Sequence, residues 1–192
     1  CSDLTSITLP KNVTKIGSKA FSRCSGLTSI TLPDSVTEIG DSAFSYCSDL
    51  TSITLPKNVT KIGRAAFENC SGLTSITLPE SVTEIGSEAF YYCSGLTSIT
   101  LPESVVEIGD HAFSSCDNLE SIKVNENNKV YDSRENCNAI IEKSSNTLIA
   151  GCKNTKVPSG VMKIGYGAFF DCSDLMSITL PESVTEKIGR AH

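Results

Sequence analysis

The chain has 192 residues, of which 39% are hydrophobic and 6% aromatic, with no tryptophan and a formal net charge of −6. So few large side chains suit a series of small shared cores better than one compact core. An acidic chain without a basic cluster argues against binding to nucleic acid or to an anionic membrane surface. No apolar run approaches the roughly 18 residues of a membrane span.

A 23-residue period organises the chain from its first residues onward. Leu4, Ile7, Gly17 and Phe21 each recur at this interval through five successive units. A period of this size is typical of solenoids, in which stacked coils share a core that one coil could not bury alone. The chain starts and stops inside a repeat, so we expect it to be a fragment of a longer protein.

The first segment of each unit is a predicted strand. In the unit that starts at Leu73, Ser75 and Thr77 alternate with Ile76 and Leu78, and Pro79 ends the run. Alternating polar and β-branched residues indicate a half-buried strand, and proline has no N–H for a ladder. We expect about seven coils with parallel strands at residues 6–9, 29–32, 52–55, 75–78, 98–101, 121–124 and 177–180.

The rest of the unit predicts a second short strand and a short helix. Val82 and Ile85 lie in the extended segment, Gly86 turns the chain, and residues 87–93 have room for one or two helical turns. The predicted fold class is therefore an α/β solenoid. The residues expected to point inward are Leu73, Ile76, Leu78, Val82, Ile85, Ala89, Phe90 and Cys93, with their equivalents.

The period slips by 33 residues after the sixth strand. We therefore expect a single solenoid domain, residues 1–192, with regular coils over 1–124, an irregular insertion over 125–157 and resumed coils over 158–192. Two apolar runs on either side of Ser144 and Ser145 predict a β-hairpin over 137–152. In this hairpin Glu142 faces Thr147, Ala139 faces Ala150, and Cys137 faces Cys152.

The predicted hairpin has one apolar face and one wetter face. The wetter face carries Asn138, Glu142 and Thr147.

The predicted hairpin also brings two cysteines opposite each other. Opposed residues have Cβ atoms about 4.5–5.5 Å apart, which is near the range of a disulfide. A Cys137–Cys152 disulfide and a pair of packed thiols both stay open, because the redox compartment is unknown. The apolar face comprises Cys137, Ala139, Ile141, Leu148, Ala150 and Cys152.

Seven of the nine cysteines occupy one position of the repeat. A zinc site needs four ligands converging on one point, and a straight column with one cysteine per coil does not converge. Free cysteine packs as a small hydrophobic residue, so we expect a column of buried thiols rather than a metal or redox ladder. The column comprises Cys1, Cys24, Cys47, Cys70, Cys93, Cys116 and Cys172.

No constellation predicts catalysis, a cofactor or a metal. The two histidines, His111 and His192, have no carboxylate, serine or cysteine partner at a fixed spacing, so a solvated surface role is expected for both. There is no glycine-rich phosphate loop. The sequence predicts that the protein is not an enzyme.

The outward side of the predicted strands is the candidate partner-binding face. It is a nearly uncharged grid of hydroxyl groups, interrupted by Glu120 and Lys123 near the insertion. Exposed aromatic residues lie on another side, where Tyr91 and Tyr92 form a candidate edge. The face comprises Thr28, Ser29, Thr31, Thr51, Ser52, Thr54, Thr74, Ser75, Thr77, Thr97, Ser98 and Thr100.

The repeat resembles the BspA-like leucine-rich repeats of surface proteins from anaerobic bacteria and some parasitic protists. The resemblance rests on LTSITLPDSVTEIGDSAFSYC, from Leu27 to Cys47, and on its copies over nearly the whole chain. It implies a right-handed solenoid, a cell-surface or secreted location, and binding to host matrix proteins or neighbouring cells. The extra Lys187 before Ile188 departs from the pattern and puts the last coil in doubt.

Three classes of function remain open. The first is a non-catalytic module that binds a protein or another cell-surface macromolecule. The second is a structural spacer or stalk. The third, an ice-binding array of hydroxyls, requires a flat face, whereas leucine-rich-repeat faces usually curve.

Overall fold

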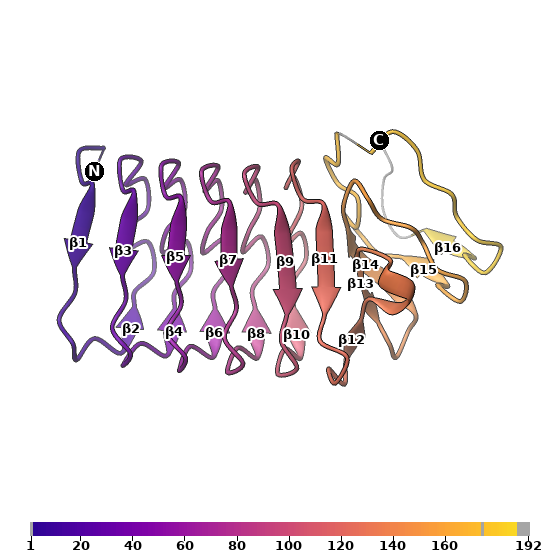
Figure 1. The fold of residues 1–192 in the computed structure, drawn as a ribbon, viewed down its shortest axis with the longest axis horizontal. Helices are drawn as coiled ribbons and strands as arrows, with labels where there is room; N and C mark the ends of the chain where they lie inside the picture. The colour runs from indigo at the N-terminus through magenta and orange to yellow at the C-terminus, as the bar shows by residue number, and fades with distance from the viewer. Residues whose placement is uncertain (1, 174, 188–192) are drawn as a thin grey trace.

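The computed structural model describes residues 2–173 and 175–187 and shows a stack of coils with a rearranged C-terminal end (Figure 1). One side of the stack is a six-stranded parallel sheet in the order β1-β3-β5-β7-β9-β11. Equivalent residues pair between neighbouring coils, as in Ile7 with Ile30 and Ile53 with Ile76. The 23-residue period thus sets the register of the sheet.

Six of the seven predicted strands form in this sheet, and each places isoleucine inward between exposed or half-buried polar residues. Its strands are β1 (Ser6–Thr8), β3 (Ser29–Thr31), β5 (Ser52–Thr54), β7 (Ser75–Thr77), β9 (Ser98–Leu101) and β11 (Ser121–Val124). The prediction of a strand at 177–180 is wrong. On the preceding coil, the N–H groups of Thr155 and Lys156 bond back to Cys152 and Cys137, so that coil offers no strand to pair with.

A second parallel sheet, of five two-residue strands, forms the adjacent side of the coils. Its strands are β2 (Lys15–Ile16), β4 (Glu38–Ile39), β6 (Lys61–Ile62), β8 (Glu84–Ile85) and β10 (Glu107–Ile108). Lysine and glutamate alternate along the first four coils. Their Nζ and Oε1 atoms pair at 2.8 Å in Lys15–Glu38 and at 2.6 Å in Lys61–Glu84.

The third side contains turns where the sequence predicted short helices, and the described residues include no α-helix. The backbone explains the difference. Lys19 and Arg23 have positive φ angles of 59° and 61°, and the same two positions recur in later coils. A residue in this left-handed region breaks an α-helix. The N–H of Lys19 points to the next coil and donates to the Asp41 carbonyl at 2.8 Å.

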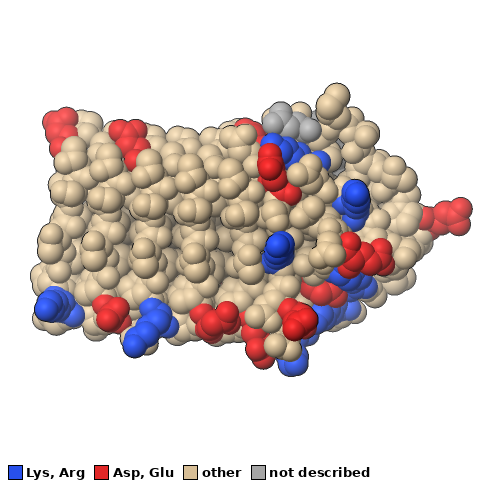
Figure 2. Space-filling model, in the orientation of Figure 1, with Lys and Arg blue, Asp and Glu red and all other residues tan. Residues whose placement is uncertain are grey.

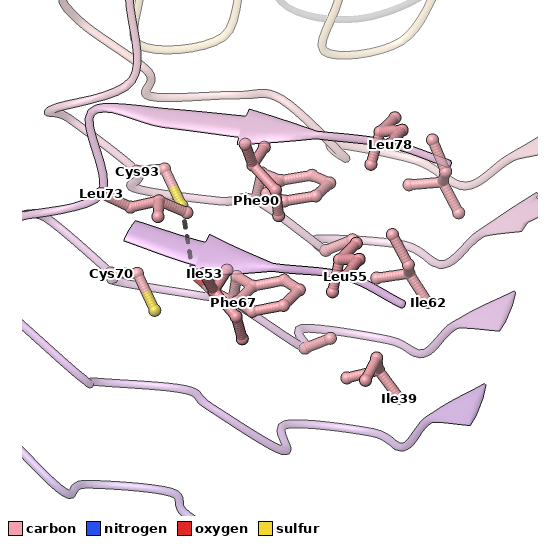
Figure 3. Close-up of a cluster of buried hydrophobic side chains, with 14 of the residues drawn as sticks. Ile39, Ile53, Leu55, Ile62, Phe67, Cys70, Leu73, Leu78, Phe90 and Cys93 are labelled. Atoms are coloured by element: carbon pink, nitrogen blue, oxygen red, sulfur yellow. Dashed lines mark hydrogen bonds between the residues drawn. The ribbon is translucent and has the colours of Figure 1, made fainter. Parts of the chain in front are cut away.

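The core lies between the three sides and is built from columns of identical residues (Figure 3). All the residues predicted to point inward from the unit at Leu73 are buried, which confirms the predicted core. Phe44, Phe67 and Phe90 stack with ring centroids 5.4 Å apart. The same column continues to Phe21 and Phe113.

The predicted cysteine column lies beside the phenylalanine column. The Cys93 thiol donates to the Phe67 carbonyl of the preceding coil at 3.1 Å, and the Cys70 thiol donates to the Phe44 carbonyl at 3.1 Å. The free, buried members are Cys24, Cys47, Cys70, Cys93 and Cys116, Cys172 is half-buried, and Cys1 lies outside the described residues.

The insertion and the resumed coils form a third sheet in the order β12-β13-β14-β15-β16. Its strands are β12 (Tyr131–Asp132), β13 (Ala139–Glu142), β14 (Thr147–Gly151), β15 (Lys163–Ile164) and β16 (Glu186–Lys187), with a 3₁₀ turn at Arg134–Asn136. β13 and β14 are antiparallel, which confirms the hairpin. β14 and β15 are parallel, so the hairpin joins the insertion to the resumed coils.

The register of the hairpin differs from the prediction at one end. Glu142 faces Thr147 as predicted, but a bulge between Ile140 and Ile141 shifts the pairing, so that Ala139 faces Gly151 and not Ala150. Gly151 fits there because a Cβ atom would lie 2.2 Å from the Phe169 ring. The bulge therefore places Gly151, which has no side chain, against the Phe169 ring.

Asn138 and Glu142 of the predicted wetter face are half-buried, as expected, but most apolar residues on both faces of the hairpin are buried. Ile140 joins the core of the regular coils, whereas Ala139 and Ile141 join a second cluster with Val161 and Ala168 of the resumed coils. Thr147 is also buried. The physical reason is that the hairpin is inserted between two stacks, each of which covers one of its faces.

Cys137 and Cys152 are free, buried thiols in the structure. Cys137 packs in the second cluster, and Cys152 packs in the core of the regular coils. The Cys152 thiol donates to the Asn138 carbonyl at 3.4 Å. In the structure the two thiols are unjoined and pack in different clusters, and a disulfide between them stays a prediction.

Asn128 fixes the start of the insertion to the last regular coil. This fully buried side chain donates to the carbonyls of Pro102 and Val105, both at 2.9 Å. Its Oδ1 accepts the N–H groups of Val130 and Tyr131 at 2.9 and 2.8 Å. All four hydrogen-bonding positions of the amide are thus used.

The extra Lys187 changes the register of the last strand. Glu186 pairs with Lys163, and Lys187 pairs with Ile164, so Lys187 takes the backbone position that isoleucine has in the other coils. The residues after it, including His192, lie outside the described part of the chain.

Candidate partner-binding surfaces

The strand face, defined as the outward residues of β3, β5, β7 and β9 with the threonine before each strand, is a continuous exposed surface. All twelve serine and threonine residues proposed for it are exposed. Figure 2 shows that the central band over these strands carries no lysine, arginine, aspartate or glutamate, and that charged residues lie along its margins. The face therefore offers hydroxyl and methyl groups without strong electrostatic attraction.

Only some of these hydroxyl groups bond within the protein. The Oγ1 atoms of Thr28, Thr74 and Thr97 donate to carbonyls of the preceding coil at 3.2–3.5 Å. Within the described residues, the Ser-x-Thr pairs of the strands, such as Ser52 and Thr54, have no side-chain hydrogen bond. These hydroxyls remain available to a partner.

The grid ends at β11, where charged residues replace the hydroxyls. Glu120 pairs with Lys153 of the insertion, with the Nζ and Oε1 atoms 3.0 Å apart, and Lys123 is exposed. The insertion thus marks one end of the uncharged face.

The predicted Tyr91–Tyr92 edge belongs to a larger group of rings at the junction with the resumed coils. The ring centroids of Tyr91 and Tyr92 are 4.6 Å apart, and Tyr91 lies 6.5 Å from Phe170. His111 lies 5.2 Å from Phe170 and 5.0 Å from Tyr166. We call these five residues the junction aromatic patch. Burial raises the pKa of Tyr91.

Hydrogen bonds hold the two sides of this patch together. The Asp171 carboxylate accepts the Tyr92 and Ser115 hydroxyls, each at 3.3 Å. The Ser115 N–H donates to the Phe170 carbonyl at 3.3 Å, which continues the inter-coil pattern of the earlier turns. On this side, the coil around residue 170 therefore follows the coil around residue 115 directly.

His111 is half-buried at the junction, which corrects the expectation of a solvated surface position. Its Nδ1 lies 3.2 Å from the Ser114 hydroxyl. A Cβ atom on Gly167 would lie 2.3 Å from the imidazole, and Gly167 also has a positive φ of 69°. Glycine at this position lets the two coils close over the histidine.

A cavity of about 230 Å³ lies beside the patch, where β10 ends one sheet and β12 and β13 begin the next. The residues that line it include three with aromatic rings, His111, Tyr131 and Tyr166, and two acidic residues, Asp110 and Glu142. Tyr131 is nearly fully buried, and burial raises its pKa. Among the residues that the structure describes, no lysine or arginine lines the cavity.

The sequence interpretation missed Asp110, Tyr131, Glu142 and Tyr166 as members of one site. The 33-residue shift of the repeat period could have placed two of these residues together. The repeat position of Asp110 recurs 56 residues later at Tyr166, so the two lie on adjacent coils once the insertion is set aside. The closeness of Tyr131 and Glu142 follows from the pairing of β12 with β13, which the repeat does not encode.

Within the described part of the chain, no three histidine, cysteine, aspartate or glutamate side chains gather as a metal site would require. The same residues include no helix with the length and apolar character needed to cross a membrane.

Comparison with known families shows what class of protein has this fold. The model of the BspA type leucine-rich repeat region matches residues 1–120, 38–145 and 140–191, in six copies. The chain belongs to this family. A search of curated proteins returned no match.

Solved structures of bacterial leucine-rich repeat proteins share the fold. A leucine-rich cell surface protein from Faecalibacterium prausnitzii is 33% identical, with a TM-score of 0.71 over 96% of this chain and 56% of its own. A leucine-rich repeat protein from Eubacterium ventriosum is 29% identical, with a TM-score of 0.78 over 95% of this chain and 49% of its own. The pneumococcal vaccine antigen PcpA is 26% identical, with a TM-score of 0.73 over 94% of this chain and 51% of its own. The chain thus spans about half the length of these three relatives.

Proposed function

We propose that this chain is a non-catalytic binding module of a cell-surface or secreted protein, and that it binds a protein or another surface macromolecule through the strand face. The observation that carries the proposal is the exposed, uncharged grid of hydroxyls whose Ser-x-Thr pairs are not used within the fold. The cell-surface description of the Faecalibacterium relative supports the location.

The regular grid gives affinity through many weak contacts. A partner that spans several coils gains contacts with each one, so binding grows with the number of coils engaged. A repeated hydroxyl pattern is a poor source of specificity, because aromatic and arginine anchors dominate most interfaces. The junction aromatic patch, with Tyr91 and Tyr92, and the hairpin are the proposed specificity elements.

The test replaces four exposed residues of the strand face, Ser52, Thr54, Ser75 and Thr77, by lysine. Residues 52 and 75 pair across the sheet, as do 54 and 77, so like charges meet at two places. Each such pair costs roughly 0.2–1 kcal/mol, which leaves the buried core intact. Binding to a panel of purified extracellular-matrix proteins is measured by surface plasmon resonance, and circular dichroism checks the fold.

A matched control carries four lysines at exposed residues outside this face, namely Asn12, Thr14, Ser18 and Asn127. We expect the control to bind as the unchanged chain does and the strand-face variant to lose binding. Equal binding by both variants would move the site to the junction aromatic patch or the hairpin. Failure of the unchanged chain to bind any member of the panel would favour a structural spacer.

A further inference from the structure

The cavity beside the junction aromatic patch has the composition of a cation site. Three of its wall residues carry rings, His111, Tyr131 and Tyr166, and two are acidic, Asp110 and Glu142. Aromatic faces attract ammonium and guanidinium groups, and carboxylates form charge-assisted hydrogen bonds with them. Among the described residues, no lysine or arginine lines the cavity.

The two carboxylates differ in how the fold uses them. Glu142 accepts the Ser145 hydroxyl, which orients it at the end of the hairpin. Asp110 is exposed, and its carboxylate has no hydrogen bond or ion pair with any described residue. The exposed Asp110 carboxylate can therefore bind a group that enters from solvent, while the half-buried Glu142 carboxylate is oriented by Ser145.

The size of the cavity limits its occupant. Sites for drug-sized ligands usually measure about 300–1,000 Å³, and this cavity measures about 230 Å³. One long side chain fills such a volume. Tyr166 lines the cavity and is 59% exposed, so the cavity reaches the surface beside an accessible ring. The ring of Phe170 lies 5.2 Å from His111 of the same lining and extends this apolar surface.

We propose that this cavity receives a lysine or arginine side chain of the protein partner and so supplies the anchor that the uniform strand face lacks. This inference rests on the proposed binding function, since a spacer has no partner. The cation lies between the carboxylates of Asp110 and Glu142 and against the ring of Tyr166. The apolar stem of the side chain covers the ring surface, and its charge reaches the acidic end.

The test uses small probes, so it needs no identified partner. The ¹⁵N-labelled chain is titrated with N-acetyl-arginine amide and N-acetyl-lysine amide, with neutral N-acetyl-citrulline amide as the isosteric control. We expect the basic probes to shift amide signals of residues around His111, Glu142 and Tyr166, and citrulline to leave them unchanged.

Two variants locate the site, and a third controls for net charge. Asp110→Asn should weaken binding roughly three- to tenfold, as expected for the loss of one charge-assisted contact at a partly exposed site. Tyr166→Ala should weaken it by a similar factor. Glu80→Gln removes the same charge from an exposed residue remote from the cavity and should leave binding unchanged.

Three results would overturn the inference. They are the absence of shifts at the cavity at the highest probe concentration, equal binding of citrulline, and unchanged binding by Asp110→Asn. Each would leave the strand-face proposal standing, because that proposal is tested with whole partners and different variants. Conversely, if the strand-face variant kept its binding to whole partners, binding of the basic probes at the cavity would be unaffected.

Discussion

At the scale of single residues, the phenylalanine column is a continuous stack of rings within the buried core. Phe67 is fully buried and stacks between Phe44 and Phe90, with centroid distances of 5.4 Å on both sides. Phe67→Ala leaves a cavity that two neighbouring coils would have to close, so we expect a loss of about 3–5 kcal/mol in the free energy of unfolding. Urea denaturation followed by circular dichroism measures this loss.

Phe21→Ala is the internal comparison for this prediction. Phe21 contacts only one other ring of the column and retains 8% exposure. Its replacement should cost less than that of Phe67, because part of its surface already meets solvent. Equal losses at the two positions would show that the end of the stack is packed as tightly as its middle.

The buried cysteine column should lower the stability of the fold at alkaline pH. Burial raises the pKa of the Cys47 thiol from its ordinary value near 9 to about 11, and it raises the pKa of Cys116 to about 12. Between those values the folded state holds a proton that the unfolded state has lost. Stability from these thiols is therefore fully present below about pH 9 and falls as the pH rises toward 11–12.

Cys47→Ala tests this dependence. The free energy of unfolding is measured in urea at intervals from pH 8 to about 10.5, which lies inside the range over which the folded and unfolded thiols differ in protonation. The variant should show a slope shallower by up to about 1.4 kcal/mol per pH unit. Tyrosines and lysines titrate equally in both proteins, so the difference reports the thiol. Parallel slopes would mean that the thiolate is tolerated in the column.

At the scale of elements, the position of the hairpin depends on Asn128. Asn128→Ala removes the acceptor of the Val130 and Tyr131 N–H groups and the donor to two carbonyls, and the Tyr131 N–H and the Val105 carbonyl are buried. Each unsatisfied buried group costs about 1–3 kcal/mol, although local relaxation and water recover part of this. We expect a loss of roughly 2–4 kcal/mol, together with faster hydrogen exchange in β12 and β13.

Asn127→Ala is the matched control, because Asn127 is exposed and its side chain makes no hydrogen bond with any described residue. Its loss should be within about 0.5 kcal/mol of zero. If Asn128→Ala were equally mild, the hairpin would be held by its two apolar faces alone.

An element could be predicted from the sequence where local residues determine it, and could not where contacts with a neighbouring coil determine it. The strands at Ser52–Thr54 and Ser75–Thr77 follow from alternation and proline, both of which are local. The turns around Lys19 and Arg23 were predicted as short helices, because the left-handed residues and the N–H groups directed at the next coil depend on the stacked neighbour. Composition alone does not distinguish these two states.

The hairpin shows the same limit. Its turn and the pairing of Glu142 with Thr147 were predictable from the two apolar runs. The bulge between Ile140 and Ile141 was not predictable, because the two apolar runs do not encode the approach of the Phe169 ring to Gly151. The burial of both hairpin faces also depends on two stacks whose relative position the sequence pattern does not give.

At the scale of the whole molecule, the fold divides into a uniform part and a unique part. The regular coils give an exposed face of hydroxyls, and the sequence was sufficient to place it because every residue of that face repeats. The junction is the place where the repeat is broken, and it contains the aromatic rings, the cavity and its two acidic residues. Under the proposed function, the regular coils supply the area of contact with a partner, and the junction supplies the specificity.

The central claim is that partners lie along the strand face, and site-specific photo-crosslinking tests it most directly. Benzoylphenylalanine is placed at exposed Thr54 or Thr77, and at exposed Asn12 or Thr37 as controls away from the grid. Each labelled chain is irradiated with a purified protein that it binds. The account predicts crosslinks from Thr54 and Thr77 and few from Asn12 and Thr37. Efficient crosslinks from the control positions, with none from the strand face, would contradict it.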